Sequence, residues 1–240
     1  MISIPPGSAL ADAVWAALGT VLDPELDEPI TELDFVESCT VSPDGVATVG
    51  LRLPTFFCAP NFSFLMVADA YDAVSAVEGV TRADVTLADH HASTEINGGV
   101  AAQAGFVKSF EGSDQGEAVA ELDNLRLDFF RKAALAGQDR VARPLVDAGV
   151  GPDELSDMNL GEVPPSSDLV RMRERRAALG LASDDSAPLL IDAEGNRITP
   201  GQVPLHLRRA RLQRVGIETN GEFCKSLLTA RYAAGEKAPA

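Results

Sequence analysis

The segment Leu53-Pro54-Thr55-Phe56-Phe57-Cys58-Ala59-Pro60-Asn61 joins a stretch with strand character to a stretch with helix character. Residues 46–53 are mostly aliphatic and β-branched, which predicts a strand that enters the segment. Residues 62–77 carry apolar side chains at helical spacing, which predicts a helix that leaves it. Cys58 is therefore expected in a loop at a helix N-terminus, where unpaired backbone N–H groups and the helix dipole favour a thiolate.

Two roles are open for Cys58 at this position. A thiolate would bind a soft metal or attack an electrophile. A free cysteine is more often a small apolar side chain that fills a corner of a core. The local sequence supports both roles equally.

The sequence on both sides of this segment extends it into a small α/β unit. Apolar side chains at helical spacing predict a first helix over residues 10–21. Pro43-Asp44-Gly45 has the chemistry of a hairpin turn. Strand-like stretches lie at residues 33–41, 46–53 and 80–87. The predicted fold class is α+β, with residues 1–100 forming a small α-β-β-α-β sandwich.

The rest of the chain, residues 101–240, is predicted to be mainly helical. We expect a small hairpin at residues 189–198. Helices are expected at residues 116–137, 138–148, 168–179, 203–215 and 222–232. This region is predicted to be a C-terminal extension that packs on the first domain or docks beside it.

Composition and charge exclude several classes of protein. The chain has 240 residues, of which 45% are hydrophobic, and a formal net charge of −16. The acidic excess argues against nucleic acid and against an anionic membrane surface as partners. No stretch of about 18 apolar residues is present, so no membrane span is expected.

The three cysteines, Cys39, Cys58 and Cys224, are odd in number and widely spaced. This pattern does not fit a disulfide framework. Residues 1–6 lack the basic and apolar regions of a signal peptide. We therefore expect free thiols in a reducing cytoplasm.

An ordered set of motifs within residues 8–90 resembles the metal–sulfur (iron–sulfur) cluster assembly factor family, which includes the PaaD-like and SufT-like proteins. After a first helix, the set comprises Asp23-Pro24-Glu25, Leu33-Asp34-Phe35-Val36, a hairpin, Leu53-Pro54-Thr55, Cys58 and Pro60. Two positions depart from the family pattern. Asp34 stands where the family has glycine, and Ala59 is inserted between Cys58 and Pro60.

The resemblance implies a role in iron–sulfur cluster assembly or delivery, with iron or an iron–sulfur cluster as a transient cofactor. Cys58 matches the functional cysteine of the family, and Asp23 and Glu25 match its acidic motif, so these three are the cofactor-binding candidates. The alternative for the acidic pair is a turn that ends the first helix, with a carboxylate as its cap.

Further ligands would be needed, because iron–sulfur clusters take four thiolates or substitutes and the chain has no Cys-x-x-Cys. His90 and His91 follow the third strand and offer imidazole nitrogens. Cys224 starts the last predicted helix beside Lys225 and could complete a metal site with Cys58. The alternatives are a strand-end hydrogen bond for the histidines and simple packing for Cys224. A cluster would be bridged by two chains, completed by a partner, or held transiently.

The sequence favours a maturation factor over an enzyme. Residues 1–240 contain no Gly-x-Ser-x-Gly, no phosphate-binding Gly-rich loop and no His-Glu-x-x-His. The predicted function is delivery of iron or a cluster to a client apo-metalloenzyme, by family analogy an iron-dependent monooxygenase. Two alternatives are a client-specific adapter or chaperone without its own metal, and a thiol-dependent enzyme that uses Cys58.

Overall fold

The computed structural model describes residues 9–102 and 115–233, and within the second range it describes side chains from residue 124 onward. The chain divides into two compact units. Unit 1 comprises Met1–Asp123 and Asn220–Ala240, and unit 2 comprises Asn124–Thr219. The element order, three strands among helices followed by a mostly helical region, confirms the predicted α+β class. The proposed domain boundary near residue 100 stays a prediction.

The sheet of unit 1 has three strands: β1 (Val36–Val41), β2 (Val46–Leu51) and β3 (Arg82–Leu87). The strand order is β1-β2-β3, with β1 antiparallel and β3 parallel to β2. Along β2, Ala47 and Val49 are buried, whereas Thr48 between them is exposed. This alternation is typical of a sheet that buries one face in the core and leaves the other in water.

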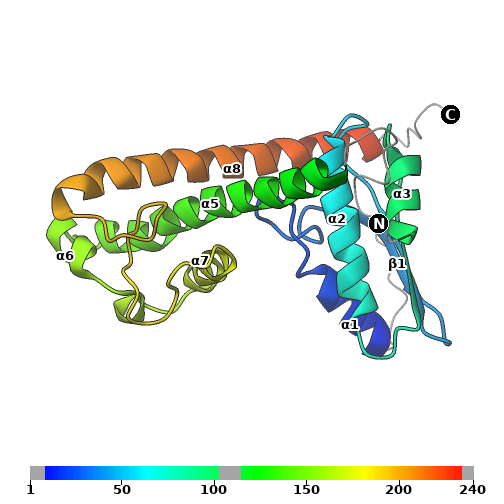
Figure 1. Ribbon diagram of the computed structural model, residues 1–240, viewed down its shortest axis with the longest axis horizontal. Helices are drawn as coiled ribbons and strands as arrows, with labels where there is room; N and C mark the ends of the chain where they lie inside the picture. The colour runs from blue at the N-terminus through cyan, green and yellow to red at the C-terminus, as the bar shows by residue number, and fades with distance from the viewer. Residues whose placement is uncertain (1–8, 103–114, 234–240) are drawn as a thin grey trace. The chain divides into compact units, whose positions relative to one another are not determined.

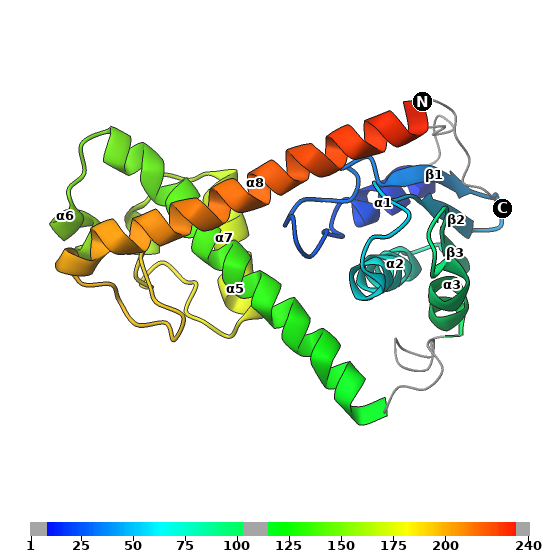
Figure 2. The ribbon, with the colours of Figure 1, turned by 90° about the horizontal axis from the view of Figure 1, so that it is seen from above.

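Helices α1 (Ala9–Leu18), α2 (Pro60–Ser75) and α3 (Ser93–Ala101) complete the N-terminal part of unit 1. Helix α2 packs against β3 and lies between α1 and α3 (Figures 1 and 2). The last turns of α8 (Val203–Ala233) also belong to this unit, and Leu228 joins its core. The predicted helix–strand–strand–helix–strand order is confirmed.

Strand β1 begins at Val36, three residues later than the predicted 33–41, because the backbone turns at Asp34. Asp34 has φ of 59°, in the left-handed region where glycine is favoured. Its carbonyl accepts a hydrogen bond from the Arg52 side chain at 3.3 Å. The structure therefore explains the glycine of the family pattern, and aspartate is one of the few side chains that tolerate this conformation.

Substitutions at Asp34 should separate backbone strain from side-chain effects. Asp34→Gly is expected to keep the free energy of unfolding within about 1 kcal/mol of the wild type, whereas Asp34→Val should lower it by about 1–2 kcal/mol. Urea unfolding measures both. Thr40→Val, on an exposed position of β1 that pairs regularly with Thr48, is the control. Equal losses from the two valine variants would contradict a role for the backbone conformation.

Unit 2 is helical apart from its loops. Its elements are α5 (Gln115–Asp147) from Asn124 onward, α6 (Pro152–Asp157), η1 (Leu160–Glu162), α7 (Ser167–Ala178), η2 (Pro200–Gln202) and the part of α8 up to Thr219. Helices α5 and α8 are joined by an ion pair of 2.6 Å between Asp139 and Arg214. The predicted hairpin near residue 195 is present as a single bridge between Ile191 and Arg197.

Two pairs of predicted helices are each one continuous helix. The predicted helices at 116–137 and 138–148 both fall in α5, which ends one residue earlier at Asp147, and those at 203–215 and 222–232 both lie in α8. The expected break at Gly137 was wrong, because this glycine serves close packing: an added Cβ would lie 3.1 Å from Met172 Cβ of α7. Isolated glycines inside α8 are likewise tolerated because Ile217 and Leu228 on the same helix are buried.

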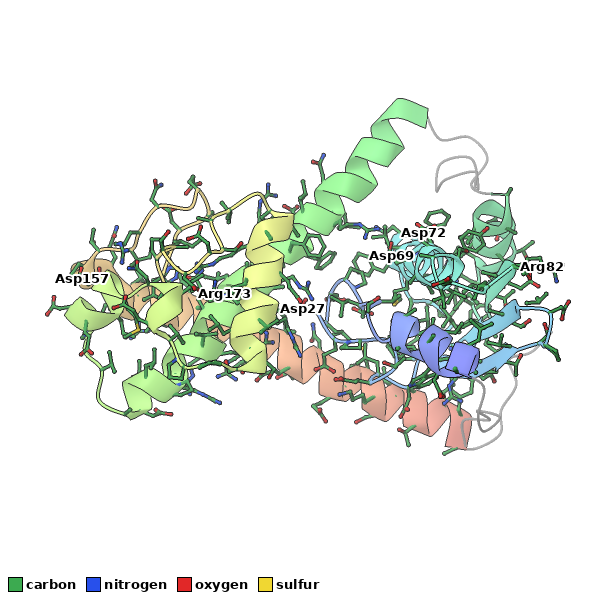
Figure 3. The ribbon with its side chains drawn as sticks, turned by 90° about the horizontal axis from the view of Figure 1, so that it is seen from below. Asp27, Asp69, Asp72, Arg82, Asp157 and Arg173 are labelled. Atoms are coloured by element: carbon green, nitrogen blue, oxygen red, sulfur yellow. The ribbon has the colours of Figure 1, made fainter. Side chains whose placement is uncertain are left out.

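The two units differ in charge. Residues 124–219 hold 14 of the 20 basic and 14 of the 36 acidic residues, so unit 2 is neutral and unit 1 carries the entire net charge of −16. Asp27, Asp69 and Asp72 lie in unit 1, where Arg82 is one of few basic residues (Figure 3). In the described ranges, no helix has the length and apolar character that crossing a membrane requires.

Candidate functional site

Cys58 lies in the loop between β2 and α2, as predicted. Pro60 opens α2 at its first helical position, where its missing N–H costs nothing. Ala59, the residue inserted relative to the family pattern, therefore stands at the N-cap of α2 and provides no side-chain cap. The Cys58 side chain is half-buried, and its Sγ lies 3.4 Å from the Thr55 hydroxyl. The thiol is thus accessible, with a polar neighbour from its own loop.

His90 holds this loop in place. Its Nδ1 accepts a hydrogen bond from the Ala92 N–H at 3.1 Å, so Nε2 carries the proton and donates to the Cys58 carbonyl at 2.7 Å. The Ser63 hydroxyl lies 3.3 Å from the same Nε2. The ring is 3% exposed, and burial lowers the pKa of His90 despite the bond to Cys58. Both ring nitrogens are engaged, so its role as a metal ligand stays a prediction that requires one bond to break.

His91 is placed differently, because among the residues that the structure describes only one of its ring nitrogens has a hydrogen-bond partner. Its Nδ1 donates to the Phe56 carbonyl at 3.0 Å, since a carbonyl can only accept. The neutral ring then has its lone pair on Nε2. A backbone carbonyl on the far nitrogen is the usual way in which proteins orient a metal-binding histidine. The ring is exposed and lies 5.7 Å from that of Phe57, which is 78% exposed.

Asp23 caps the turn that follows α1. Its Oδ1 accepts hydrogen bonds from the backbone N–H groups of Glu25 at 2.9 Å and Leu26 at 2.8 Å. These bonds show the capping role that was the alternative to ligation. Burial nevertheless raises the pKa of Asp23 to about 6, against the lowering effect of the two hydrogen bonds. Burial therefore destabilises the ionised form of the Asp23 carboxyl group.

Cys224 on α8 lies within electrostatic reach of this turn and of the Cys58 loop. The pKa of Cys224 is raised to about 11, first by burial and then by the negative charges of Asp23, Cys58 and Glu25. Both Cys58 and Cys224 pack against the core of unit 1. Cys224 therefore lies within electrostatic range of Cys58 and of the acidic pair, although Asp23 and Cys224 are about 200 positions apart in the sequence. Cys39, by contrast, is buried in β1 as a core residue.

Polar contacts hold α8 against the site. Lys225 Nζ lies 2.9 Å from Glu28 Oε2. Near the end of the helix, the Arg231 guanidinium donates to the Leu53 carbonyl at 3.0 Å and to the Asp89 carbonyl at 2.6 Å. Leu53 begins the Cys58 loop and Asp89 precedes His90, so one arginine connects α8 to both segments.

Loss of Arg231 should therefore destabilise unit 1. Arg231→Ala leaves two carbonyls without their charged donor, and we expect the free energy of unfolding to fall by about 2–3 kcal/mol in urea titrations. Arg82→Ala is the matched control, since the Arg82–Asp84 ion pair is exposed and should contribute no more than about 1 kcal/mol. Similar effects of the two variants would show that Arg231 does not anchor α8.

Three supporting residues were not identified from the sequence. Thr55 belongs to the family motif, and the spacing Thr55-x-x-Cys58 places its hydroxyl near the thiol. Ser63 and Arg231 gave no signal, because their contacts with His90 and Leu53 join segments far apart in the chain. Within residues 9–102 and 115–233, no three His, Cys, Asp or Glu side chains are arranged to hold a metal ion by themselves.

Comparisons with known proteins place the N-terminal part of the chain in a family. Residues 11–85 match the model of the family described as iron-sulfur cluster assembly protein. An iron-sulfur cluster carrier protein of Mycobacterium leprae (strain TN) is 37% identical over 78 residues, which cover 32% of this chain and 20% of the relative. The chain thus spans about a fifth of the length of that curated relative. No solved structure matches the chain. The N-terminal part of this chain, with the Cys58 loop and the Asp23 turn, is therefore a domain of the iron–sulfur cluster assembly protein family.

Proposed function

We propose that this protein binds iron or an iron–sulfur cluster transiently at Cys58 and delivers it to a client apo-metalloenzyme. The observation that carries the proposal is that Cys58 and a second thiol, Cys224, pack against the same core, with Cys224 in electrostatic range of Cys58 and of the acidic turn. Two thiols give a soft metal the ligands that it prefers. The family of residues 11–85 and the carrier name of the relative support the same cargo.

The incomplete ligand set suits a carrier. A cluster takes four ligands, and one chain offers Cys58 and Cys224, with the free Nε2 of His91 near the same loop. A second copy of the chain, or the client, would supply the remainder. Ligands that are shared between two molecules can be exchanged one at a time, which is what transfer requires. Enzymatic use of Cys58 is less well supported, because His90 bonds the carbonyl of Cys58 and not its thiol.

The domain that would bind the client is strongly acidic, since unit 1 carries the full net charge of −16. Complementary basic groups on the client would speed the encounter and orient it. By family analogy the client is an iron-dependent monooxygenase, and the cytoplasm would keep the thiols reduced. The helical unit 2 is available for client-specific docking.

Anaerobic reconstitution with iron and sulfide tests the proposal. The wild-type chain should take up iron and show visible charge-transfer absorption, and Cys58→Ser should lose both. Cys39→Ala is the control, because Cys39 is a buried core residue and its loss should leave iron binding unchanged. A wild-type chain that takes up no iron would overturn the proposal. Full activation of the client by Cys58→Ser would instead support an adapter without its own metal.

A further inference from the structure

Unit 2 contains a buried positive charge that no carboxylate neutralises. Arg176 on α7 is fully buried, and its guanidinium donates to the carbonyls of Pro188 at 2.7 Å and Leu189 at 2.6 Å. Its Nε has no hydrogen-bond partner, and no Asp or Glu of the described part of the chain pairs with it. Burial, helped by the charge of Arg173, lowers the pKa of Arg176 to about 10. A buried charge without a counter-charge is unfavourable for folding.

Arg176 lines a cavity of about 320 Å³ that lies within unit 2. Helices α5, α7 and α8 and the loop around residue 192 form its walls. Leu135, Leu179 and Ile191 give these walls an apolar character. The volume is at the lower end of the range for small-molecule sites, which combine apolar walls with a few convergent polar groups.

The polar groups of this cavity are predominantly cationic. Arg131, Lys132 and Arg209 line it together with Arg176, against one acidic residue, Asp192. The Asp192 carboxylate is engaged in its own turn, where it accepts hydrogen bonds from the backbone N–H groups of Glu194 at 3.0 Å and Asn196 at 2.8 Å. Arg209 makes no ion pair within the described part of the chain. A cationic group is thus free beside the unneutralised Arg176.

The pKa of His206 depends on the charged groups that line the cavity. The Gln138 amide donates to the Ile191 carbonyl at 3.2 Å, which makes its oxygen the acceptor of the His206 Nε2–H at 3.0 Å. Nδ1 of the neutral ring is left without a proton. Burial, then Arg209 and then Arg176, lowers the pKa of His206, and Asp192 acts in the opposite direction. An added negative charge would shift this balance upward.

We propose that the cavity binds a small organic anion, with its carboxylate or phosphate group near Arg176 and Arg209 and its apolar body against Leu135, Leu179 and Ile191. The anion supplies the counter-charge that Arg176 lacks, and the apolar walls select against fully hydrated inorganic ions. This site lies in unit 2 and does not depend on the proposed cluster binding, so metal-free protein can be used to test it.

NMR spectra of the histidine rings test the site directly, because the chain has three histidines. Phenyl phosphate, an anion with an apolar body, should shift the His206 signals and raise the pKa of His206, while His90 and His91 in unit 1 stay unchanged. Inorganic phosphate should bind more weakly, and benzyl alcohol should have no effect on the pKa. If His206 does not respond to phenyl phosphate, or if benzyl alcohol raises its pKa equally, the proposal is wrong.

A pair of neighbouring variants tests the role of Arg209. Arg209→Gln should weaken phenyl phosphate binding by about tenfold or more, as expected for loss of a charge-assisted contact. Arg208→Gln removes the same charge from the preceding residue. Arg208 is exposed like Arg209 but lies outside the cavity wall, so its loss should leave binding unchanged. Equal losses would indicate a diffuse surface effect, and no loss with Arg209→Gln would exclude its contact. Either result would overturn the proposed geometry.

Discussion

Cys224→Ser is expected to remove as much bound iron from the reconstituted protein as Cys58→Ser does. The two thiols are within electrostatic reach of each other, and both pack on the core of unit 1. If they bind one cluster, a serine at either position removes one of two thiol ligands from each chain. Serine is nearly the same size as cysteine, so the expected loss arises from ligand chemistry and not from packing.

The number of thiol ligands predicts how many clusters each chain binds. Cys58 and Cys224 from two copies of the chain provide the four thiolates that a cluster takes. Reconstitution should therefore give one cluster per two chains, and the cluster should sediment with a dimer. A client that supplies the other two ligands would accept the cluster from this dimer, because thiolate ligands can be replaced stepwise.

The pKa of Cys224 adds a dependence on pH. Its thiol must lose a proton before it binds metal, and burial together with Asp23, Cys58 and Glu25 raises its pKa to about 11. Iron binding should therefore release protons and become tighter as the pH rises from 6 to 9. Full retention of iron by Cys224→Ser, with loss confined to Cys58→Ser, would contradict a two-thiol site and assign Cys224 to packing.

The sequence predicted the parts of the site that local chemistry determines. The position of Cys58 before a helix follows from Pro60 and the apolar spacing after it, and the cap at Asp23 follows from Asp-Pro-Glu chemistry. The position of Cys224 near the Asp23 turn could not be derived, because proximity between residues about 200 positions apart depends on the tertiary fold of unit 1.

The contacts of His90 and His91 could not be derived from the sequence for the same reason. Adjacent residues of a strand point to opposite faces, so at most one of the two was expected to face Cys58. That expectation was wrong, because both histidines follow the end of β3 at Leu87, and His90 bonds the Cys58 carbonyl while His91 bonds the Phe56 carbonyl of the same loop. Their position directly after the third strand is evident from the sequence, whereas their hydrogen bonds to the loop depend on the backbone path of residues 56–63 and 90–92.

Asp23→Asn is expected to stabilise the protein at neutral and alkaline pH. The folded-state pKa of Asp23 is about 6, above its ordinary value of 3.8. Between about pH 4 and pH 6 the folded chain therefore binds more protons than the unfolded chain, so this group makes stability fall as the pH rises. Above that window the charged form destabilises the fold by up to roughly 2–3 kcal/mol. Asparagine removes the charge, and its side-chain oxygen can still accept hydrogen bonds from the N–H groups of Glu25 and Leu26.

Urea unfolding at pH 4 and pH 8 measures the effect. Asp23→Asn should match the wild type at pH 4 and exceed its stability at pH 8, whereas Asp72→Asn, on an exposed position of α2 (Figure 3), should parallel the wild type at both. A less stable Asp23→Asn at pH 8 would mean that the carboxylate makes a favourable charged contact. A more stable Asp23→Asn at pH 8 would show that the Asp23 carboxylate costs stability where asparagine caps equally well. Under the proposed function, we expect the charge that Asp23 places near Cys224 to attract the incoming cation.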